Sequence, residues 1–318
     1  MILSWALTLF AVTLGLLTFL GWFGRFNPIL EAPRNAAPHF LVAGIVLTLW
    51  GGLARRFVHA GVGMVVVVWF AFLLAPYLIT SSDPLPPDED GVHSALQYNV
   101  FFDNENFDET AALIIEADAD VVALHEITNL QWDELSARLP DYPFFIAEPF
   151  DGGTLSVGGG MALLSRTPLE PIEVDPEASV FGRPILAAST FVEGNEMVFV
   201  GLHPHASRHE SDKIELRELQ LEAVADLLRD EPRPAVVLTD MNITPTSPDY
   251  SRFLSDIEWR DPHRITGWDA SFPAGLGPFG IPIDHVFVSD SVALHDVSTG
   301  EGAGSDHRSL VARFSVRQ

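Results

Sequence analysis

Nearly all of the first 80 residues are apolar, and no other feature constrains the fold of this chain as strongly. Ile2 to Phe23 is an apolar run with no charge before Arg25, Phe40 to Ala54 is a shorter run, and Ala60 to Thr80 is again long. About 20 apolar residues cross a bilayer as a helix, so the outer runs are long enough and the middle one is marginal. The absence of a basic region before the first run favours a retained helix over a signal peptide. We predict that residues 1–80 are a membrane segment with two or three transmembrane helices, three being favoured, and that the lipid bilayer is their partner.

The arginines between these runs indicate the orientation in the membrane. Arg55 and Arg56 are adjacent in the second short loop, whereas Arg25 and Arg34 in the first are accompanied by Glu31. Because loops rich in Arg and Lys stay in the cytoplasm, the second loop is expected there. We therefore predict an integral protein of a bacterial-type cytoplasmic membrane, with everything after residue 80 on the extracytoplasmic side.

A change of composition marks a domain boundary. Residues 81–94 read SSDPLPPDEDGVHS, which is typical of a Pro- and acid-rich linker. From residue 95 to 318, short apolar strands alternate with helices, and the longest helix is expected over 208–229. Residues 243–280 are expected to be rich in loops. Many strands and a few helices in mixed order predict an α/β domain in which sheet packs on sheet with helices outside.

Charge and cysteine content limit the function. The chain has 43 acidic and 18 basic residues and a formal net charge of −25, which disfavours a protein that grips nucleic acid through a basic patch. Bound divalent cations can invert the local field, so phosphate chemistry is not excluded. With no cysteine, the chain has neither disulfides nor thiolate chemistry.

Polar side chains follow several of the predicted strands where each strand ends. The strand Val236–Leu238 leads into Asp240 and Asn242, and Val121–Leu124 leads into His125 and Glu126. Asn99, His203, the Asp284-His285 pair and the Asp306-His307 pair have similar positions. Each one alone could be a turn cap or a hydrogen-bonded core histidine. Together they form an oxygen-rich set with two histidines and no cysteine, which suits Mg²⁺ or Mn²⁺ better than zinc.

Seven short motifs carry a resemblance to a known family. They are YNV at 98–100, HE at 125–126, ALLSR at 162–166, LHP at 202–204, TDMN at 239–242, IDHVFVS at 283–289 and SDH at 305–307. In this order they resemble the endonuclease/exonuclease/phosphatase family, over residues 95 to about 316. The resemblance implies a four-layer α/β/β/α sandwich of two mixed sheets, here preceded by the helical membrane segment.

The resemblance also implies roles for individual residues. Asn99, Glu126 and Asp306 would hold one or two Mg²⁺ or Mn²⁺ ions. Asp240 would orient or deprotonate the attacking water, and Asn242 would hold a phosphate oxygen or the metal-bound shell. His307, oriented by Asp284, would face the scissile phosphate, with His203 as the second phosphate-facing histidine. Such a set is chemically coherent, because attack on a phosphate ester needs charge neutralisation, a placed water and a proton donor.

The substrate is less well defined than the reaction. Trp268 and Phe272, in the aromatic and Gly-rich loop 263–280, are candidates for substrate binding, and Arg166 is either structural or phosphate-facing. The favoured function is a membrane-anchored phosphoesterase of the endonuclease/exonuclease type, acting on phosphodiester or phosphomonoester bonds. The alternatives are a phosphodiesterase or phosphatase for lipid headgroups or inositol phosphates, and a non-catalytic binding domain. The sequence identifies no protein partner.

Overall fold

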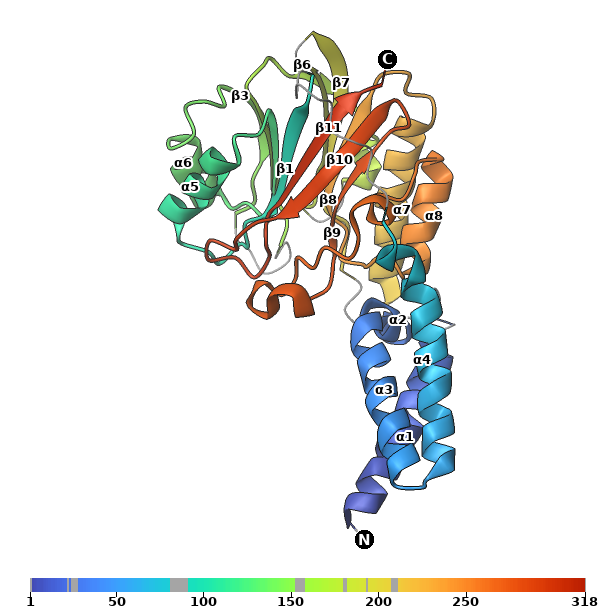
Figure 1. Ribbon diagram of the computed structural model, residues 1–318. Coiled ribbons are helices and arrows are strands. Elements are labelled where there is room, and N and C mark those ends of the chain that lie inside the picture. The colour runs from blue at the N-terminus through green and yellow to red at the C-terminus, as the bar shows by residue number, and fades with distance from the viewer. Residues whose placement is uncertain are drawn as a thin grey trace.

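Two stacked β-sheets form the centre of the C-terminal part of the chain (Figure 1). The computed structural model describes residues 2–21, 23, 28–80, 91–151, 158–179, 182–192, 194–206 and 211–317. The first sheet has the strand order β10-β11-β1-β2-β4-β3 and the second the order β5-β6-β7-β8-β9. In each sheet one pair of strands is parallel, β1 with β2 and β7 with β8, and the others are antiparallel. Both sheets are therefore mixed, as predicted.

The strands have the following bounds. The first sheet consists of β1 (His93–Asn99), β2 (Val121–His125), β3 (Phe144–Glu148), β4 (Met161–Ser165), β10 (Val292–Thr299) and β11 (Leu310–Val316). The second consists of β5 (Glu170–Ile172), β6 (Ile185–Val192), β7 (Asn195–Leu202), β8 (Ala235–Asp240) and β9 (Asp284–Val288).

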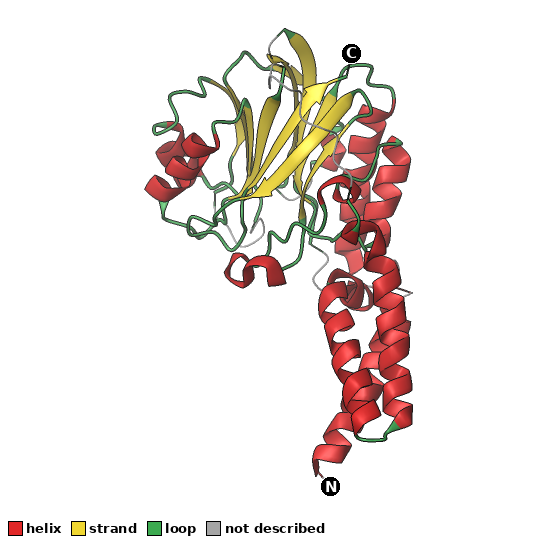
Figure 2. Cartoon of the chain, in the orientation of Figure 1, coloured by secondary structure: helices red, strands yellow, loops and turns green. Residues whose placement is uncertain are grey.

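Helices cover the outer face of each sheet (Figure 2). On the first sheet lie α5 (Phe107–Ala117) and α6 (Asn129–Ser136), which bury Ala111, Ile114 and Leu135 against it. On the second lie α7 (Ser211–Arg229) and α8 (Pro248–Ile257). A separate apolar core fills the space between the sheets. The result is the predicted four-layer α/β/β/α sandwich.

Strand alternation decides which residues enter the space between the sheets. Along β1, Leu96 and Tyr98 face the outer core with α5 and α6, whereas Ala95 faces the core between the sheets. Side chains alternate along a strand, so Gln97 and Asn99 face the same way as Ala95. Both amides are fully buried. The sheets therefore enclose polar groups at one end of an otherwise apolar layer.

The loop-rich region expected over 243–280 contains more structure than predicted. It holds α8, the short helix α9 (His263–Thr266) and the 3-10 helix η3 (Ala274–Phe279). Helix α8 begins after the Ser247 cap and buries four apolar side chains on one face, Tyr250, Phe253, Leu254 and Ile257. Their helical spacing was a signal in the sequence. Strand β10, with its polar second half, was also not predicted.

The N-terminal segment is a bundle of helices that extends from the sandwich (Figure 1). Its elements are α1 (Ile2–Leu20), α2 (Pro28–Asn35), α3 (Ala37–Leu53) and α4 (Phe57–Leu78). Within the described residues, α4 is the one helix long and apolar enough to cross a membrane, and α1 and α3 contain shorter apolar helices. Helix α2 was not predicted. The linker expected over 81–94 lies largely outside the described residues.

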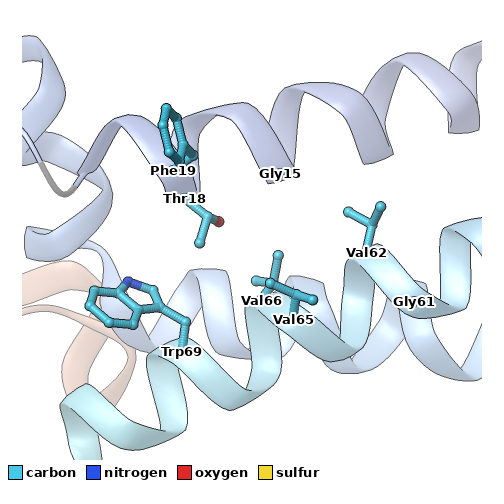
Figure 3. A pocket seen from close by; sticks show the side chains of 8 residues that line it. All are labelled: Gly15, Thr18, Phe19, Gly61, Val62, Val65, Val66 and Trp69. Carbon is cyan, nitrogen blue, oxygen red and sulfur yellow. The ribbon is translucent and has the colours of Figure 1, made fainter.

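An apolar cavity of about 560 Å³ lies between α1 and α4 (Figure 3). Its lining includes Gly15, Phe19, Val62 and Trp69. The hydroxyl of Thr18, which also lines it, donates to the carbonyl of Leu14 one turn earlier. The cavity is therefore lined mainly by hydrocarbon.

Helix α2 joins the bundle to the sandwich through buried polar contacts. The carboxylate of Glu31 accepts hydrogen bonds from Ser247 and from Arg217, the latter at 3.2 Å. Arg217 also donates to Asp249 at 2.5 Å, and all three charged side chains are almost fully buried. Asn35 accepts from the backbone and hydroxyl of Thr244 at 3.1 and 3.0 Å. Helix α2 thus holds the loop 243–247, which begins directly after Asn242.

Candidate active site

The polar residues predicted at strand ends meet at one edge of the two sheets. Strands β1, β2 and β8 end at Asn99, His125 and Asp240. The register places Asn99 opposite His125 in the first sheet and Asp240 opposite Asp284 in the second. Because β9 is antiparallel to β8, its first residue lies beside the last residue of β8. Rigid strands therefore position the cluster from both sheets.

Asp240 lies at the centre of this cluster and is buried. Its Oδ2 accepts a hydrogen bond from Asn99 Nδ2 at 2.8 Å and lies 3.4 Å from His203 Nε2 and 3.7 Å from His307 Nε2. Its Oδ1 accepts from the backbone N–H of Asn242 at 3.0 Å. The side-chain amide of Asn99 and the backbone amide of Asn242 thus fix the carboxylate, and both histidines lie near its Oδ2.

His307 is held by a second buried carboxylate. Its Nδ1 lies 2.8 Å from Asp284 Oδ2, and the other oxygen of Asp284 accepts from Gln97 Nε2 at 2.8 Å. The hydroxyl of Ser271 also faces the backbone N–H of Asp284 at 3.3 Å. Asp284 thereby holds Nδ1 of His307 and leaves Nε2 directed to the cluster.

Two of the candidate residues have left-handed backbones. Glu126 has a φ of 61° and Asn242 a φ of 56°, each just beyond the end of a strand. Non-glycine residues seldom adopt this conformation, and such strain concentrates at functional sites. The Nδ2 of Asn242 donates to the carbonyl of Pro204 at 3.2 Å, which ties the β8 loop to the loop after β7.

Burial and neighbouring charges move the pKa values of the central groups. Burial, and then the charge of Asp284, raise the pKa of Asp240 to about 7. Burial alone would lower the pKa of His307, but the Asp284 and Asp240 carboxylates raise it to about 10. Burial, and then the charge of Arg183, hold the pKa of His203 well below its usual value. At neutral pH the site therefore combines a carboxyl near its titration point, a protonated His307 and a neutral His203.

The donor set fits a divalent cation of the hard type. Ligand atoms of Glu126, His203 and Asp240 lie within 4.8 Å of one another, as do those of Asp240, Asp284 and His307. A Cβ at Gly158 would come within 3.0 Å of both Glu126 Oε1 and Arg183 Nη2, so the glycine leaves room for these two side chains. Carboxylate and amide oxygens are the ligands that Mg²⁺ and Mn²⁺ prefer. Glu126, with Asn99 beside Asp240, would hold such an ion.

Asp306 lies at the rim of the cluster. Its Oδ1 is 4.0 Å from His307 Nε2 and is buried without a hydrogen-bond partner among the described residues. The side chain as a whole is 42% exposed. A partly exposed carboxylate with a free acceptor fits the predicted metal role, which stays a prediction.

The three predicted substrate-binding residues lie in different places. The ring of Phe272 packs on His307 with centroids 4.8 Å apart, so it borders the cluster. Trp268 packs on Tyr77 of α4 and joins the apolar core of the bundle. Arg166 follows the end of β4 that is opposite to the cluster, because Met161 and not Ser165 pairs with His125. It forms an ion pair with Asp118, which supports the structural alternative for this residue.

Sequence reasoning missed several supporting residues. Gln97 and Ser271 fix Asp284, and Ser305 donates to the carbonyl of Asn99 and accepts from the backbone N–H of His307. The position of Gln97, two residues before Asn99 in a buried strand, was an available signal. Arg183 donates to the carbonyls of His203 and Pro204, and no local pattern in the sequence distinguishes it.

Several solved structures share this fold. An endonuclease/exonuclease/phosphatase from Bacteroides vulgatus is 20% identical in sequence. The alignment covers 71% of this chain and 99% of that protein, with a TM-score of 0.56. A Staphylococcus aureus beta toxin mutant with bound magnesium ions is 16% identical, with coverages of 71% and 99% and a TM-score of 0.53. Sphingomyelinase C from Streptomyces griseocarneus is 17% identical, with coverages of 70% and 99% and a TM-score of 0.52. The curated proteins gave no match.

The family follows from the sequence match as well as from the fold. A model of the Endonuclease/Exonuclease/phosphatase family matches residues 96–307, which is well over half of the chain and includes every candidate residue from Asn99 to His307. The protein therefore belongs to the Endonuclease/Exonuclease/phosphatase family.

Proposed function

We propose that this protein is a membrane-anchored, divalent-metal-dependent phosphoesterase that cleaves phosphodiester bonds by attack of water. The observation that carries the proposal is the pairing of Asp240 with His307, whose reactive atoms lie 3.7 Å apart. One carboxyl titrates near neutral pH and the neighbouring imidazole stays protonated. A base and an acid side by side are what hydrolysis of a phosphate ester needs.

Each residue of the cluster has a role in this reaction. Asp240 accepts a proton from the attacking water, and His307 donates one from Nε2 to the leaving oxygen. Asn242 and the neutral His203 bind non-bridging phosphate oxygens, and Asp284 keeps His307 oriented and charged. When bound, Mg²⁺ or Mn²⁺ would supply neutralisation of the phosphate charge, with Glu126, Asn99 and Asp306 as the residues that hold it.

The similar structures support the class of reaction. The beta toxin was solved with magnesium ions, and the Streptomyces protein is a sphingomyelinase C. An enzyme is favoured over a binding domain on this scaffold, because the base, the acid and the orienting carboxylate are all present and in contact.

The test is hydrolysis of bis-p-nitrophenyl phosphate by the full chain in detergent. We expect activity with Mg²⁺ or Mn²⁺, loss of activity in excess chelator, and recovery when the metal is returned. Asp240→Asn and His307→Ala should each lower kcat by about 10²- to 10⁴-fold, the usual contribution of a positioned acid or base. Asp226→Asn, which removes half of an exposed ion pair on α7, is the control and should change little. Near wild-type rates in either site variant, with an unchanged circular dichroism spectrum, would refute the assignment.

A further inference from the structure

The 3-10 helix η3 connects the candidate site to the helical bundle. Two residues before it, Phe272 packs on His307, and at its first residue the backbone N–H of Ala274 donates to the carbonyl of Asp306 at 2.7 Å. Two backbone hydrogen bonds between Phe272 and Ile281, of 3.0 and 2.6 Å, close the base of this loop. The loop 274–279 is therefore a fixed part of the rim of the site.

The end of the same loop lies against the bundle. The carbonyl of Phe279 is 2.9 Å from Nε2 of His39, which stands in the first turn of α3 just before its apolar run. Nearby, Trp268 packs on Tyr77 in the last turn of α4. Figure 1 shows η3 at the edge of the sandwich from which the bundle extends. The rim of the site and the domain-proximal ends of two apolar helices are thus adjacent.

The loop presents apolar side chains to solvent at this place. Leu276 is 51% exposed and Phe279 is 77% exposed. The bundle itself exposes large apolar residues along its length, among them Val46 and Leu49 on α3 and Val65, Val68 and Phe72 on α4. An apolar surface of this kind is typical of contact with lipid, and aromatic residues at its end are typical of the membrane interface. The exposed side chains of η3 lie at the end of the bundle next to the sandwich, where the carbonyl of Phe279 contacts His39.

The net negative charge of the protein favours some classes of substrate over others. The formal net charge of −25 repels polyanions such as DNA and RNA at long range. A zwitterionic headgroup carries no net charge and escapes this repulsion. A site that opens beside the bilayer also meets a high local concentration of lipid phosphodiesters.

We infer that Leu276 and Phe279 insert into the bilayer interface beside the site, and that the substrate is a zwitterionic phospholipid-type phosphodiester in the same membrane. This inference rests on the proposed function and adds the substrate class. In the reaction, the oxygen of one water forms a bond to phosphorus and the bond from phosphorus to the lipid-side oxygen breaks. The water loses a proton to Asp240 and the lipid oxygen gains one from His307. The products are a lipid alcohol and a phosphorylated headgroup.

The test compares a lipid with a soluble substrate for the same protein. The full chain is reconstituted into vesicles of phosphatidylcholine, phosphatidylethanolamine and sphingomyelin, and release of the phosphorylated headgroup is followed with Mg²⁺ present. Bis-p-nitrophenyl phosphate and plasmid DNA are assayed in parallel. The double variant Leu276→Ser/Phe279→Ser removes the two apolar side chains proposed to contact the lipid. Phe191→Ser is the matched control, because Phe191 is 58% exposed near the β6–β7 turn, at the opposite end of the strands from the site.

We expect the wild-type chain to release headgroups and the double variant to do so at least tenfold more slowly. Both should hydrolyse bis-p-nitrophenyl phosphate at rates within twofold of each other, and Phe191→Ser should behave as wild type on every substrate. A chain active on the soluble diester but inactive on the vesicles, or faster on DNA than on lipid, would overturn the inference and leave the proposed function standing. An unchanged lipid rate in the double variant, or a change only in its oligomeric state, would also overturn it. Inactivity on all substrates would refute the proposed function itself.

Discussion

His307 and Asp240 are neighbours whose raised pKa values have opposite consequences for charge. A raised pKa keeps the imidazole of His307 positively charged up to about pH 10, whereas it keeps the carboxyl of Asp240 partly neutral near pH 7. The base is lost as pH falls through about 7, and the acid is lost as pH rises through about 10. We therefore expect kcat/KM for bis-p-nitrophenyl phosphate to rise through the lower value and fall through the upper one.

Asp284 raises both pKa values that shape the pH dependence of kcat/KM, so Asp284→Asn should move both inflections to lower pH. Its carboxylate raises the pKa of Asp240 by repulsion and that of His307 by attraction, and the amide has no charge. The measurement is kcat/KM against pH at saturating Mg²⁺. Gln97→Leu is the matched control, because it removes the hydrogen bond to Asp284 but keeps the charge. An Asp284→Asn profile that overlays wild type would contradict this account of the pKa values.

At the scale of single residues, the sequence predicted the candidate site residues at the ends of strands, but it did not predict the side chains that hydrogen-bond to them. Asn99, Glu126 and Asp240 could be identified because an apolar strand precedes each of them. Arg183 and Ser271 could not, because their partners lie 20 and 13 residues away and no local pattern in the sequence marks these contacts. Arg166 shows a second limit of the sequence. A residue that follows a strand can lie at either edge of the sheet, and the direction of the strand decides at which one.

At the scale of elements, α2 shows what hydrophobic pattern alone could not predict. Its sequence, PILEAPRN, has only eight residues, two of them proline, and reads as a loop between apolar runs. It is ordered by its contacts with the sandwich. Glu31 binds Arg217 and Ser247, and Asn35 binds Thr244, so the loop after Asn242 is fixed from outside the catalytic domain.

We predict that Glu31→Gln destabilises the full chain by about 2 kcal/mol, the scale of a buried hydrogen bond to a charged group. The loss of stability should be smaller than the loss caused by leaving a buried charge without a partner, because Arg217 keeps its contact with Asp249. Urea unfolding in detergent, monitored by tryptophan fluorescence from the sandwich, gives the difference in the free energy of unfolding. Glu134→Gln is the matched control, since its i,i+4 pair with Arg138 is exposed to solvent and should contribute little to stability. Equal effects of the two substitutions would show that α2 does not hold the loop.

At the scale of the whole molecule, the layers of the sandwich followed from the order of strands and helices, but the attachment of the bundle did not. The apolar runs were visible in the sequence, and the arrangement of sheets with helices outside was predicted from mixed element order. The bundle docks through scattered pairs such as Tyr77 with the carbonyl of Pro245 and Thr246 with the carbonyl of Arg34. These pairs are separated by more than 160 residues, beyond the reach of any local pattern.

The docked bundle makes the orientation of the whole chain testable. Arg55 and Arg56 lie between α3 and α4, at the end of the bundle away from the sandwich, so placing them in the cytoplasm puts the catalytic domain outside. In a bacterial host we expect a C-terminal alkaline phosphatase fusion, active only outside the cytoplasm, to be active, and a C-terminal green fluorescent protein fusion to be dark. Fusions that end after residue 55 should show the reverse pattern. Reversed signals from the C-terminal fusions would place the catalytic domain, and its substrate, at the inner face of the membrane.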